Sequence, residues 1–289
     1  MKRFIFMGLI LAIAAMSGYG NESGIFSFKA GQFEVFMLVE SERDGNTGIL
    51  VGADEAILRR HIPSQGFKHS ANAFFVKAPG QNILIDAGTG AGGVIVEKIK
   101  SLGVQPENIN AVLITHLHGD HFGGLVRDGK AIFPNAKIYL SARELQHFTV
   151  TNPNQAAVNA LAPYKSQIVT FEPDALSTER RKEIFPGIIP IAAYGHTPGH
   201  TLYMLESGRA RLLIIGDLLH VALVQFHFPT ISATFDIDAS AAAQTRQQVL
   251  AYAAMHRIPI GGMHLVYPGI GILEAYNNGR SFNYISMDD

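Results

Sequence analysis

Short runs of apolar residues recur along the chain, each bounded by glycine, proline or polar residues. These runs are four to eight residues long and rich in Val, Ile, Phe and Tyr, which favours β-strands. We expect strands at residues 33–39, 72–78, 82–88, 111–115, 136–140, 188–194, 201–207, 211–217 and 281–287.

Longer segments between some of these strands have apolar residues at helical spacing. Residues 91–103 place Val, Ile and Leu on one face and end at Gly103, where a helix would stop. Residues 240–257 form the longest helical pattern, and either Asp238 or Ser240 provides its N-cap. The alternation of strand and helix patterns indicates a mixed α/β architecture.

A third helix is expected at residues 141–148. Ser141 offers a capping hydroxyl and Glu144 follows three residues later, which is the spacing of a capping box. The loops are short, and the chain shows no low-complexity linker or obvious repeat. We therefore predict a single mixed α/β (α+β) domain over residues 21–289.

The N-terminus follows a different pattern. Lys2 and Arg3 precede an apolar run of 13 residues, and small and polar residues come next. This order is typical of a secretory signal peptide at residues 1–20, with cleavage before Asn21. The alternative is a retained membrane anchor, but a membrane span needs about 20 apolar residues. We expect a periplasmic or secreted protein that has no membrane attachment after cleavage.

Composition narrows the possible functions. Hydrophobic residues make up 47% of the chain and charged residues 16%, which fits a globular protein with a large core. The formal net charge is −1, and no basic stretch resembles a nucleic-acid footprint, so we expect no nucleic-acid partner. Cysteine is absent, so any metal must be held by nitrogen and oxygen atoms.

The stretch THLHGDH concentrates ionisable residues after a predicted strand. In an extended chain, His116 and His118 point the same way and could bind one ion together. The chain turns at Gly119, which places Asp120 and His121 at an offset position suited to a second ion. Imidazole and carboxylate ligands favour two divalent ions, zinc first, with manganese, iron or cobalt as alternatives. The other interpretation is a histidine-rich surface loop.

Three further polar residues follow predicted strands: His196 in YGHTPGHT, Asp217 in LLIIGDLLH and His264 in PIGGMHLVYPGIG. With THLHGDH, these segments resemble the metallo-β-lactamase superfamily. The motifs ITHLHGDHFGGL, FPNAKIYLSARE, GHTPGHT, GDLLHVALVQF and HLVYPGIG are most similar to its methyl-parathion-hydrolase-like and lactonase-like branch. The likeness extends over most of residues 33–289. It implies a four-layer αββα sandwich.

The resemblance also implies a ligand set. One metal would be held by His116, His118 and His196, a second by Asp120, His121 and His264, and Asp217 would bridge both. Asp86 matches an aspartate that supports ligands in the family. In HTPGH the family uses the first histidine, so we expect a structural role for His200. His69 precedes a strand and could approach the site, although we favour an ordinary structural role for it.

Two metals that share a bridging hydroxide imply a hydrolase, because bound metal lowers the pKa of water and polarises a carbonyl or phosphoryl oxygen. Asp120 and Asp217 would orient the hydroxide and exchange its proton. His220 stands where related lactonases commonly have tyrosine. It would donate to a developing oxyanion or else face away from the site. The bridging Asp217 argues against true β-lactamase activity.

The substrate class stays open between related chemistries. We expect a small apolar lactone or neutral ester as substrate, with organophosphate triesters as the runner-up. A non-catalytic metal-binding protein is the alternative from another class. Family resemblance also suggests a homodimer. Several apolar residues near the motifs could line a pocket for an acyl chain or aryl group, although for each one we favour a place in the core: Phe122, Leu219, Phe226, Phe228 and Tyr267.

Overall fold

The computed structural model describes residues 23–287. The expected signal peptide at residues 1–20 lies outside them and stays a prediction. Within the described residues, seven strands form the first sheet. Their order across the sheet is β1 (Ile25–Ala30), β2 (Phe33–Asp44), β4 (Lys68–Ala78), β5 (Gln81–Ile85), β6 (Ala111–Leu113), β9 (Lys137–Ser141) and β10 (Ile168–Phe171). β1, β2, β4 and β5 pair antiparallel, and β5, β6, β9 and β10 pair parallel.

In the part of the chain that the structure describes, a second sheet of six strands packs against the first. Its order is β11 (Ile188–Ala192), β12 (Thr201–Ser207), β13 (Ala210–Ile214), β15 (Ile260–Gly261), β16 (Ile270–Tyr276) and β17 (Ser281–Ser286). Two small strand pairs lie apart from the sheets: β3 (Leu50–Val51) with β14 (Ser232–Ala233), and β7 (Val126–Arg127) with β8 (Lys130–Ala131). Every strand that the sequence predicted is present as a strand.

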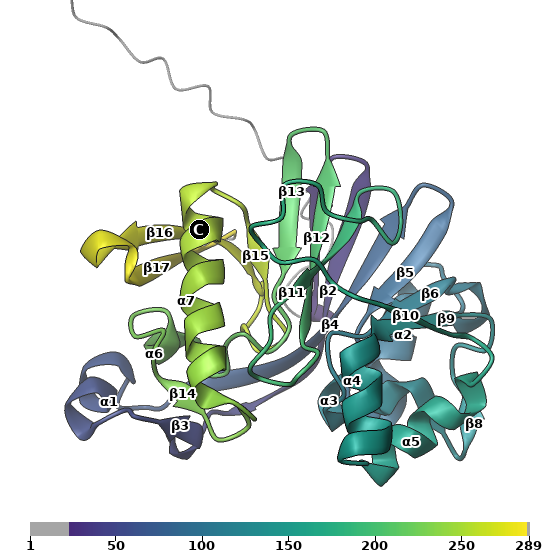
Figure 1. Cartoon of the computed structure of the whole chain (residues 1–289), viewed down its shortest axis with the longest axis horizontal. Coiled ribbons are helices and arrows are strands. Elements are labelled where there is room, and N and C mark those ends of the chain that lie inside the picture. The colour runs from purple at the N-terminus through teal and green to yellow at the C-terminus, as the bar shows by residue number, and fades with distance from the viewer. Residues whose placement is uncertain (1–22, 288–289) are drawn as a thin grey trace, which may run out of the picture.

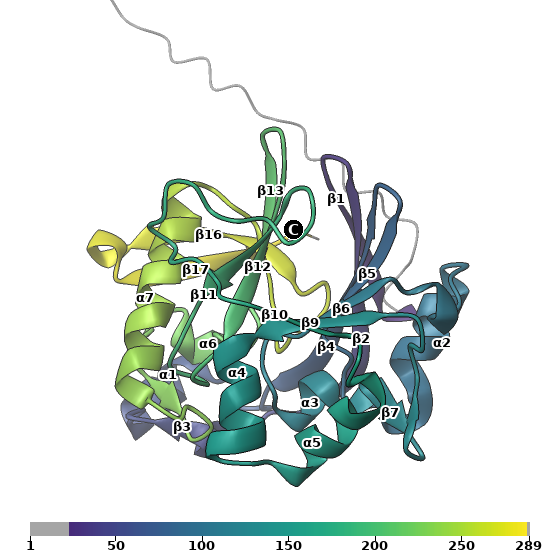
Figure 2. The same ribbon diagram turned by 45° about the vertical axis from the view of Figure 1, so that its right-hand side comes forward.

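Helices cover both outer faces of the sandwich (Figures 1 and 2). The first sheet is covered by α2 (Val94–Ser101), α3 (Gly119–Phe122) and α5 (Gln155–Leu161), and the second by α7 (Ala239–Met255). The other helices are α1 (Glu55–His61), α4 (Ala142–Gln146), which runs into a π-helical turn, and α6 (Ala222–Gln225). This arrangement confirms the expected αββα class.

Side chains that alternate between the two faces of each strand fill three layers of core: one between the sheets and one between each sheet and its helices. In β2, Val35 and Met37 face the second sheet, whereas Phe36 and Leu38 face the helices. All four are at most 7% exposed. Successive side chains of a strand point to opposite faces, so a central strand buried on both sides reads as continuously apolar. This is why the apolar runs predicted strands reliably.

Helix α7 begins as predicted, with the carboxylate of Asp238 accepting a hydrogen bond of 2.9 Å from the Ala241 N–H. Of the two expected caps, Asp238 is therefore the one used. Helix α2 begins three residues later than the expected segment, because Gly92 and Gly93 adopt left-handed conformations that an α-helix excludes. Over residues 23–287, no helix is both long and apolar enough to cross a membrane.

Candidate metal centre

The predicted ligands gather at one edge of the sandwich. β11 and β13 both run antiparallel to β12, and β15 runs parallel to β13. β11, β13 and β15 therefore point the same way, and their carboxyl ends meet at the same edge of the sheet. His196, Asp217 and His264 follow these ends. His116 and His118 follow β6 of the first sheet. Both sheets therefore contribute to one cluster.

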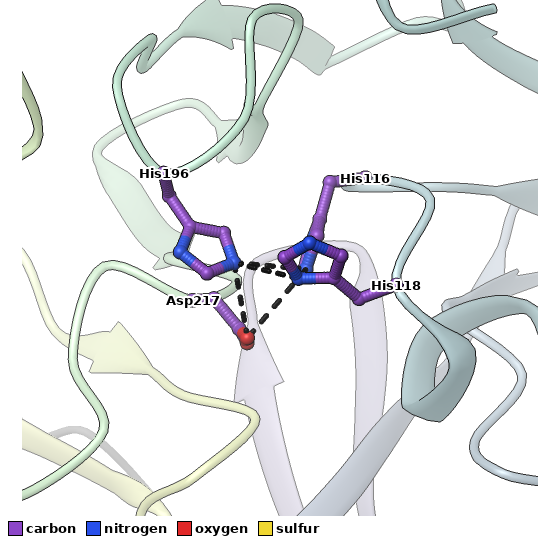
Figure 3. A group of neighbouring side chains, drawn as sticks. All are labelled: His116, His118, His196 and Asp217. Atoms are coloured by element: carbon purple, nitrogen blue, oxygen red, sulfur yellow. Dashed lines mark hydrogen bonds and ion pairs between the residues drawn. The ribbon is translucent and has the colours of Figure 1, made fainter. Parts of the chain in front are cut away.

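The first group consists of His116, His118, His196 and Asp217 (Figure 3). His116 Nε2 lies 3.1 Å from His118 Nδ1 and 3.2 Å from His196 Nε2. His118 Nδ1 and His196 Nε2 are 3.0 Å apart. Asp217 Oδ2 is 3.5 Å from both Nε2 atoms. Ligand atoms of a tetrahedral zinc ion with bonds of 2.0–2.1 Å are roughly 3.3 Å apart. The four atoms thus have the spacing of one coordination shell.

The second group consists of Asp120, His121, Asp217 and His264. Asp217 Oδ1 lies 3.1 Å from the Nε2 atoms of both His121 and His264. Asp120 Oδ1 is 3.6 Å from His121 Nε2, and Asp120 Oδ2 is 3.6 Å from His264 Nε2. The structure therefore brings together all seven residues that the sequence proposed as ligands, in the two predicted groups. Asp217 belongs to both.

The outward nitrogens of two rings are anchored by Asp86. Its Oδ2 accepts from His121 Nδ1 at 2.7 Å and from the Thr115 hydroxyl at 2.7 Å. Because this hydroxyl donates to Asp86, its oxygen accepts from His116 Nδ1 at 3.0 Å. Each of the two rings thus carries its proton on Nδ1 and turns a lone pair on Nε2 toward the cluster. Asp86 supports the ligands, as the family resemblance implied.

Two other rings are held in the same way by partners that sequence reasoning did not single out. His196 Nδ1 donates to Asp236 Oδ1 at 2.9 Å, and His264 Nδ1 donates to the Ser70 carbonyl at 2.9 Å. Metal-binding histidines usually donate their second N–H to a carboxylate or carbonyl. Because each Nδ1 is occupied as a donor, each Nε2 is the ring atom left to bind a cation. The donor set therefore fits divalent metal ions.

Electrostatics support the same interpretation. Burial would raise the pKa of Asp217, but the positive charge that His121, His264 and His116 can carry outweighs it and holds that pKa well below its usual range. Burial would lower the pKa of His121, yet the carboxylates of Asp217, Asp120 and Asp86 raise it well above its usual range. The carboxylates of Asp217 and Asp120 therefore favour positive charge at this position, and divalent ions would supply it.

His200 is a structural residue, as expected. Its Nδ1 donates to the Ala193 carbonyl at 3.0 Å, and its Nε2 accepts from the Asp217 N–H at 3.1 Å. Both ring nitrogens are used, so His200 positions the backbone of Asp217. Gly216 makes room for this contact: its φ is +50°, and a Cβ there would lie 2.5 Å from His200 Nε2.

The capping box expected between Ser141 and Glu144 does not form. Ser141 makes no capping hydrogen bond, and the Glu144 side chain is fully buried. Glu144 Oε1 accepts from the Leu117 N–H at 2.8 Å, and Oε2 accepts from the Thr197 hydroxyl and the Gly199 N–H, both at 2.8 Å. Leu117 lies between two candidate ligands and Thr197 follows a third. Glu144 therefore clamps two ligand loops together.

His220 lies within the site and does not face away from it. Its Nε2 is 3.3 Å from Asp217 Oδ2, and its ring stacks 5.3 Å from that of His264. The backbone N–H of His220 donates to the fully buried Gln225 Oε1 at 2.7 Å, which holds the residue in place. The ring of His69 also lies against that of His264, tilted by 31° with the centroids 4.5 Å apart, so His69 does approach the site.

The five apolar residues considered for a substrate pocket belong to the core. Phe122 is buried under the first sheet's helices, and Leu219 and Phe226 are buried under the second. The other two, Phe228 and Tyr267, are partly buried against further core clusters. Exposed apolar residues near the site include Phe235, whose ring is 5.6 Å from that of His220, and Ile237. Both are about half exposed, at 50% and 52%.

Residues 67–256 match the family model of the metallo-beta-lactamase superfamily. The chain belongs to this superfamily. The motif resemblance and the αββα class inferred from it are thereby confirmed.

Curated relatives of this superfamily member include metallo-hydrolases. The probable metallo-hydrolase YflN of Bacillus subtilis (strain 168) is 28% identical over 164 residues, 51% of this chain and 60% of that protein. An N-acyl homoserine lactonase of Bacillus cereus is 25% identical over 121 residues, 42% of each chain. The matches thus span about half the length of these curated relatives.

Solved structures of the superfamily match over nearly the whole chain. The hydrolase AbOPH has a TM-score of 0.80 and 29% sequence identity, covering 91% of this chain and 97% of that one. AidC, a dizinc quorum-quenching lactonase in complex with a product, has a TM-score of 0.79 and 24% identity with the same coverage. The second likeness shows a shared fold.

Proposed function

We propose that the protein is a binuclear metal-dependent hydrolase that cleaves lactones or related neutral esters. One observation carries this proposal: the two oxygens of Asp217 face separate groups of ligand atoms. Oδ2 faces the first group at 3.5 Å, and Oδ1 faces the second group at 3.1 Å. A carboxylate shared in this way suits two divalent ions, most readily zinc, held side by side.

The ions would supply a nucleophile at neutral pH, by lowering the pKa of water, and would polarise the substrate's carbonyl oxygen. The residues of the chain orient the water and move its proton. Asp217 is buried, whereas the Asp120 side chain is 34% exposed. Asp120 is therefore the carboxylate of the centre that solvent reaches, and it is placed to accept the proton of the attacking water and return it to the leaving group.

His220 would donate an N–H to the carbonyl oxygen as negative charge develops on it. Its Nδ1 is buried and has no hydrogen-bond partner among residues 23–287, and its Nε2 lies 3.3 Å from Asp217 Oδ2. Burial lowers the pKa of this ring, although Asp217 opposes the effect, so the ring is neutral and carries one N–H. A donor held in place before reaction stabilises an oxyanion without reorganisation.

Relatives and exposed apolar residues support the lactone or ester class. An N-acyl homoserine lactonase and a quorum-quenching lactonase are among the similar proteins. Phe235 and Ile237 expose large apolar side chains beside His220 and His196, where the hydrocarbon part of a neutral substrate could rest. Organophosphate triesters, with a polarised P=O in place of C=O, are the runner-up.

The test combines metal content with a substrate panel. Mass spectrometry of the purified protein should find about two divalent ions per chain, the number expected for a shared-carboxylate centre. The same preparation is assayed on aliphatic lactones, aryl esters and aryl phosphotriesters, with lactones expected to turn over fastest. Faster phosphotriester turnover would favour the runner-up. Bound metal without turnover on any of the three would favour the non-catalytic alternative.

We also propose that the protein is exported, on the strength of the residue pattern at positions 1–20. Expression of the full chain in a host with a secretion system should yield a mature form that begins at or near Asn21. Mass spectrometry of the intact exported protein checks this. An uncleaved chain in the membrane fraction would favour the retained anchor.

A further inference from the structure

Asp236 is a buried carboxylate that lies outside the seven proposed ligands but contacts one of them. Its Oδ1 accepts from His196 Nδ1 at 2.9 Å. Its Oδ2 accepts from the Ala233 N–H at 2.9 Å and from Arg246 Nη2 at 3.2 Å. The Asp236 side chain has no exposed area, and that of Arg246 is 1% exposed. A charged pair with so little access to water needs every hydrogen bond it makes.

The position of Arg246 is set by its other contacts. Nε donates to the Leu218 carbonyl at 2.6 Å, and Nη1 donates to the carbonyls of Pro229 and Ile231, both at 2.9 Å. Leu218 directly follows the shared ligand Asp217. Arg246, on α7, therefore links the backbone beside Asp217 to Asp236, the carboxylate that binds His196. Its guanidinium cannot turn without breaking several buried hydrogen bonds.

The loop that carries Asp236 also holds the backbone of His196. The Ile237 N–H donates to the His196 carbonyl at 3.0 Å, and the Asp238 N–H donates to the Gly195 carbonyl at 2.9 Å. Side chain and backbone of His196 are thus bound by one short segment. That segment is in turn anchored by Arg246. None of these contacts has a local sequence signature, since Asp236 is 40 residues from His196.

We propose that Asp236 and Arg246 together are positioning residues for the ion of the first group. Asp236 accepts a hydrogen bond from the Nδ1–H of His196, which keeps the ring proton on Nδ1 and leaves the Nε2 lone pair free for the ion. Arg246 neutralises Asp236 and keeps its second oxygen turned away from His196. This inference rests on the proposed metal-binding function and assigns roles to two residues beyond the ligand set.

Asp236→Asn tests the first role. An amide has one oxygen, while three donors face the two carboxylate oxygens of Asp236. If the NH2 group faces His196, it donates to Nδ1 and moves the ring proton to Nε2, where the ion should bind; if it faces Arg246, two N–H groups oppose it. Removing such a supporting carboxylate typically lowers metal affinity about 10- to 100-fold.

The matched control is Asp238→Asn. It removes the same charge from the same loop, but the Asp238 side chain caps α7 through the Ala241 N–H and touches no ligand. Zn²⁺-loaded proteins are titrated with a competing chelator, and retained zinc is measured by mass spectrometry. We expect one of two zinc dissociation constants to rise about 10- to 100-fold in Asp236→Asn and neither to change in Asp238→Asn.

Equal zinc retention in both variants, or equal loss in both, would overturn the inference. Should Asp236→Asn fail to fold, Arg246→Lys replaces it, because lysine keeps the charge but cannot reach three carbonyls and the carboxylate at once. Unchanged zinc affinities in a folded Arg246→Lys variant would likewise overturn it. Turnover plays no part in this readout, so a wild-type protein that binds zinc but hydrolyses nothing refutes the proposed function alone.

Discussion

Gly199 and Glu144 lie in direct contact: the Gly199 N–H donates to Glu144 Oε2 at 2.8 Å, and a Cβ on Gly199 would come within 2.4 Å of the Glu144 backbone nitrogen. Helix α4 is therefore seated against the loop that carries His196. The same carboxylate also holds the loop of His116 and His118 through Leu117. The spacing of three proposed ligands depends on this one side chain.

Glu144→Gln should weaken the clamp. The amide offers one oxygen to three donors, so at least one buried N–H loses its partner, at a cost of about 1–3 kcal/mol. We expect a lower melting temperature and weaker zinc retention, measured by thermal unfolding and by mass spectrometry after dialysis. Gln146→Ala, at an exposed position on the same helix, serves as the control. Zinc retention equal to that of the control would contradict the clamp.

Asp217→Ala should lower metal content and activity together, since it removes a ligand atom from both groups. Loss of metal assistance costs several kcal/mol of transition-state stabilisation, so turnover should fall by on the order of 100-fold or more. Metal analysis and an ester or lactone assay on the same preparation check both. Asp128→Asn removes a charge from an exposed turn and should alter neither. Full metal content in Asp217→Ala would refute the shared-ligand role.

His220→Ala should spare the metal and slow carbonyl substrates most. Removing one oxyanion donor typically costs about 10²–10³-fold in kcat, whereas a phosphotriester places its oxygen differently. The measurement is kcat on a lactone and on an aryl phosphotriester, with metal content as a check. His256→Ala, at an exposed site, is the control. Unchanged lactone hydrolysis in His220→Ala would show that the ring donates nothing to the reaction.

Gly216→Ala should destabilise the protein more than Gly208→Ala. Both glycines have positive φ, +50° and +62°, so alanine costs roughly 1–2 kcal/mol at either position. At Gly208 nothing lies within 4 Å of the added Cβ, whereas at Gly216 it would meet His200 Nε2 at 2.5 Å. The difference between the two free energies of unfolding, from denaturant titration, isolates the clash beside Asp217. Equal values would mean that His200 moves aside freely.

Chelation should lower the melting temperature, because ions that bind only the folded state stabilise it by mass action. Each ion at 100 times its dissociation constant contributes about 2.7 kcal/mol, which corresponds to a shift of several degrees in a protein of this size. Thermal unfolding with and without chelator measures the effect, and added Zn²⁺ should restore the original value. An identical melting temperature in both conditions would argue against folded-state metal binding.

The sequence predicted the elements and ligands whose signal is local. THLHGDH places four candidate ligands within six residues, and the apolar runs mark strands buried on both faces. Glu144 was misassigned because SARE fits a capping box equally well, while its partners Thr197 and Gly199 lie 53 and 55 residues away. Asp236 was missed for the same reason. Supporting contacts at such separations leave no spacing pattern in the sequence.

The ligands come from both halves of the sandwich: residues 116–121 follow the first sheet, and His196, Asp217 and His264 follow strands of the second. Bound metal would therefore cross-link the halves of a chain that has no cysteine and can form no disulfide. Neither half alone carries a complete coordination shell. Any change that slides one sheet over the other, however far from the centre, would consequently register as lost metal.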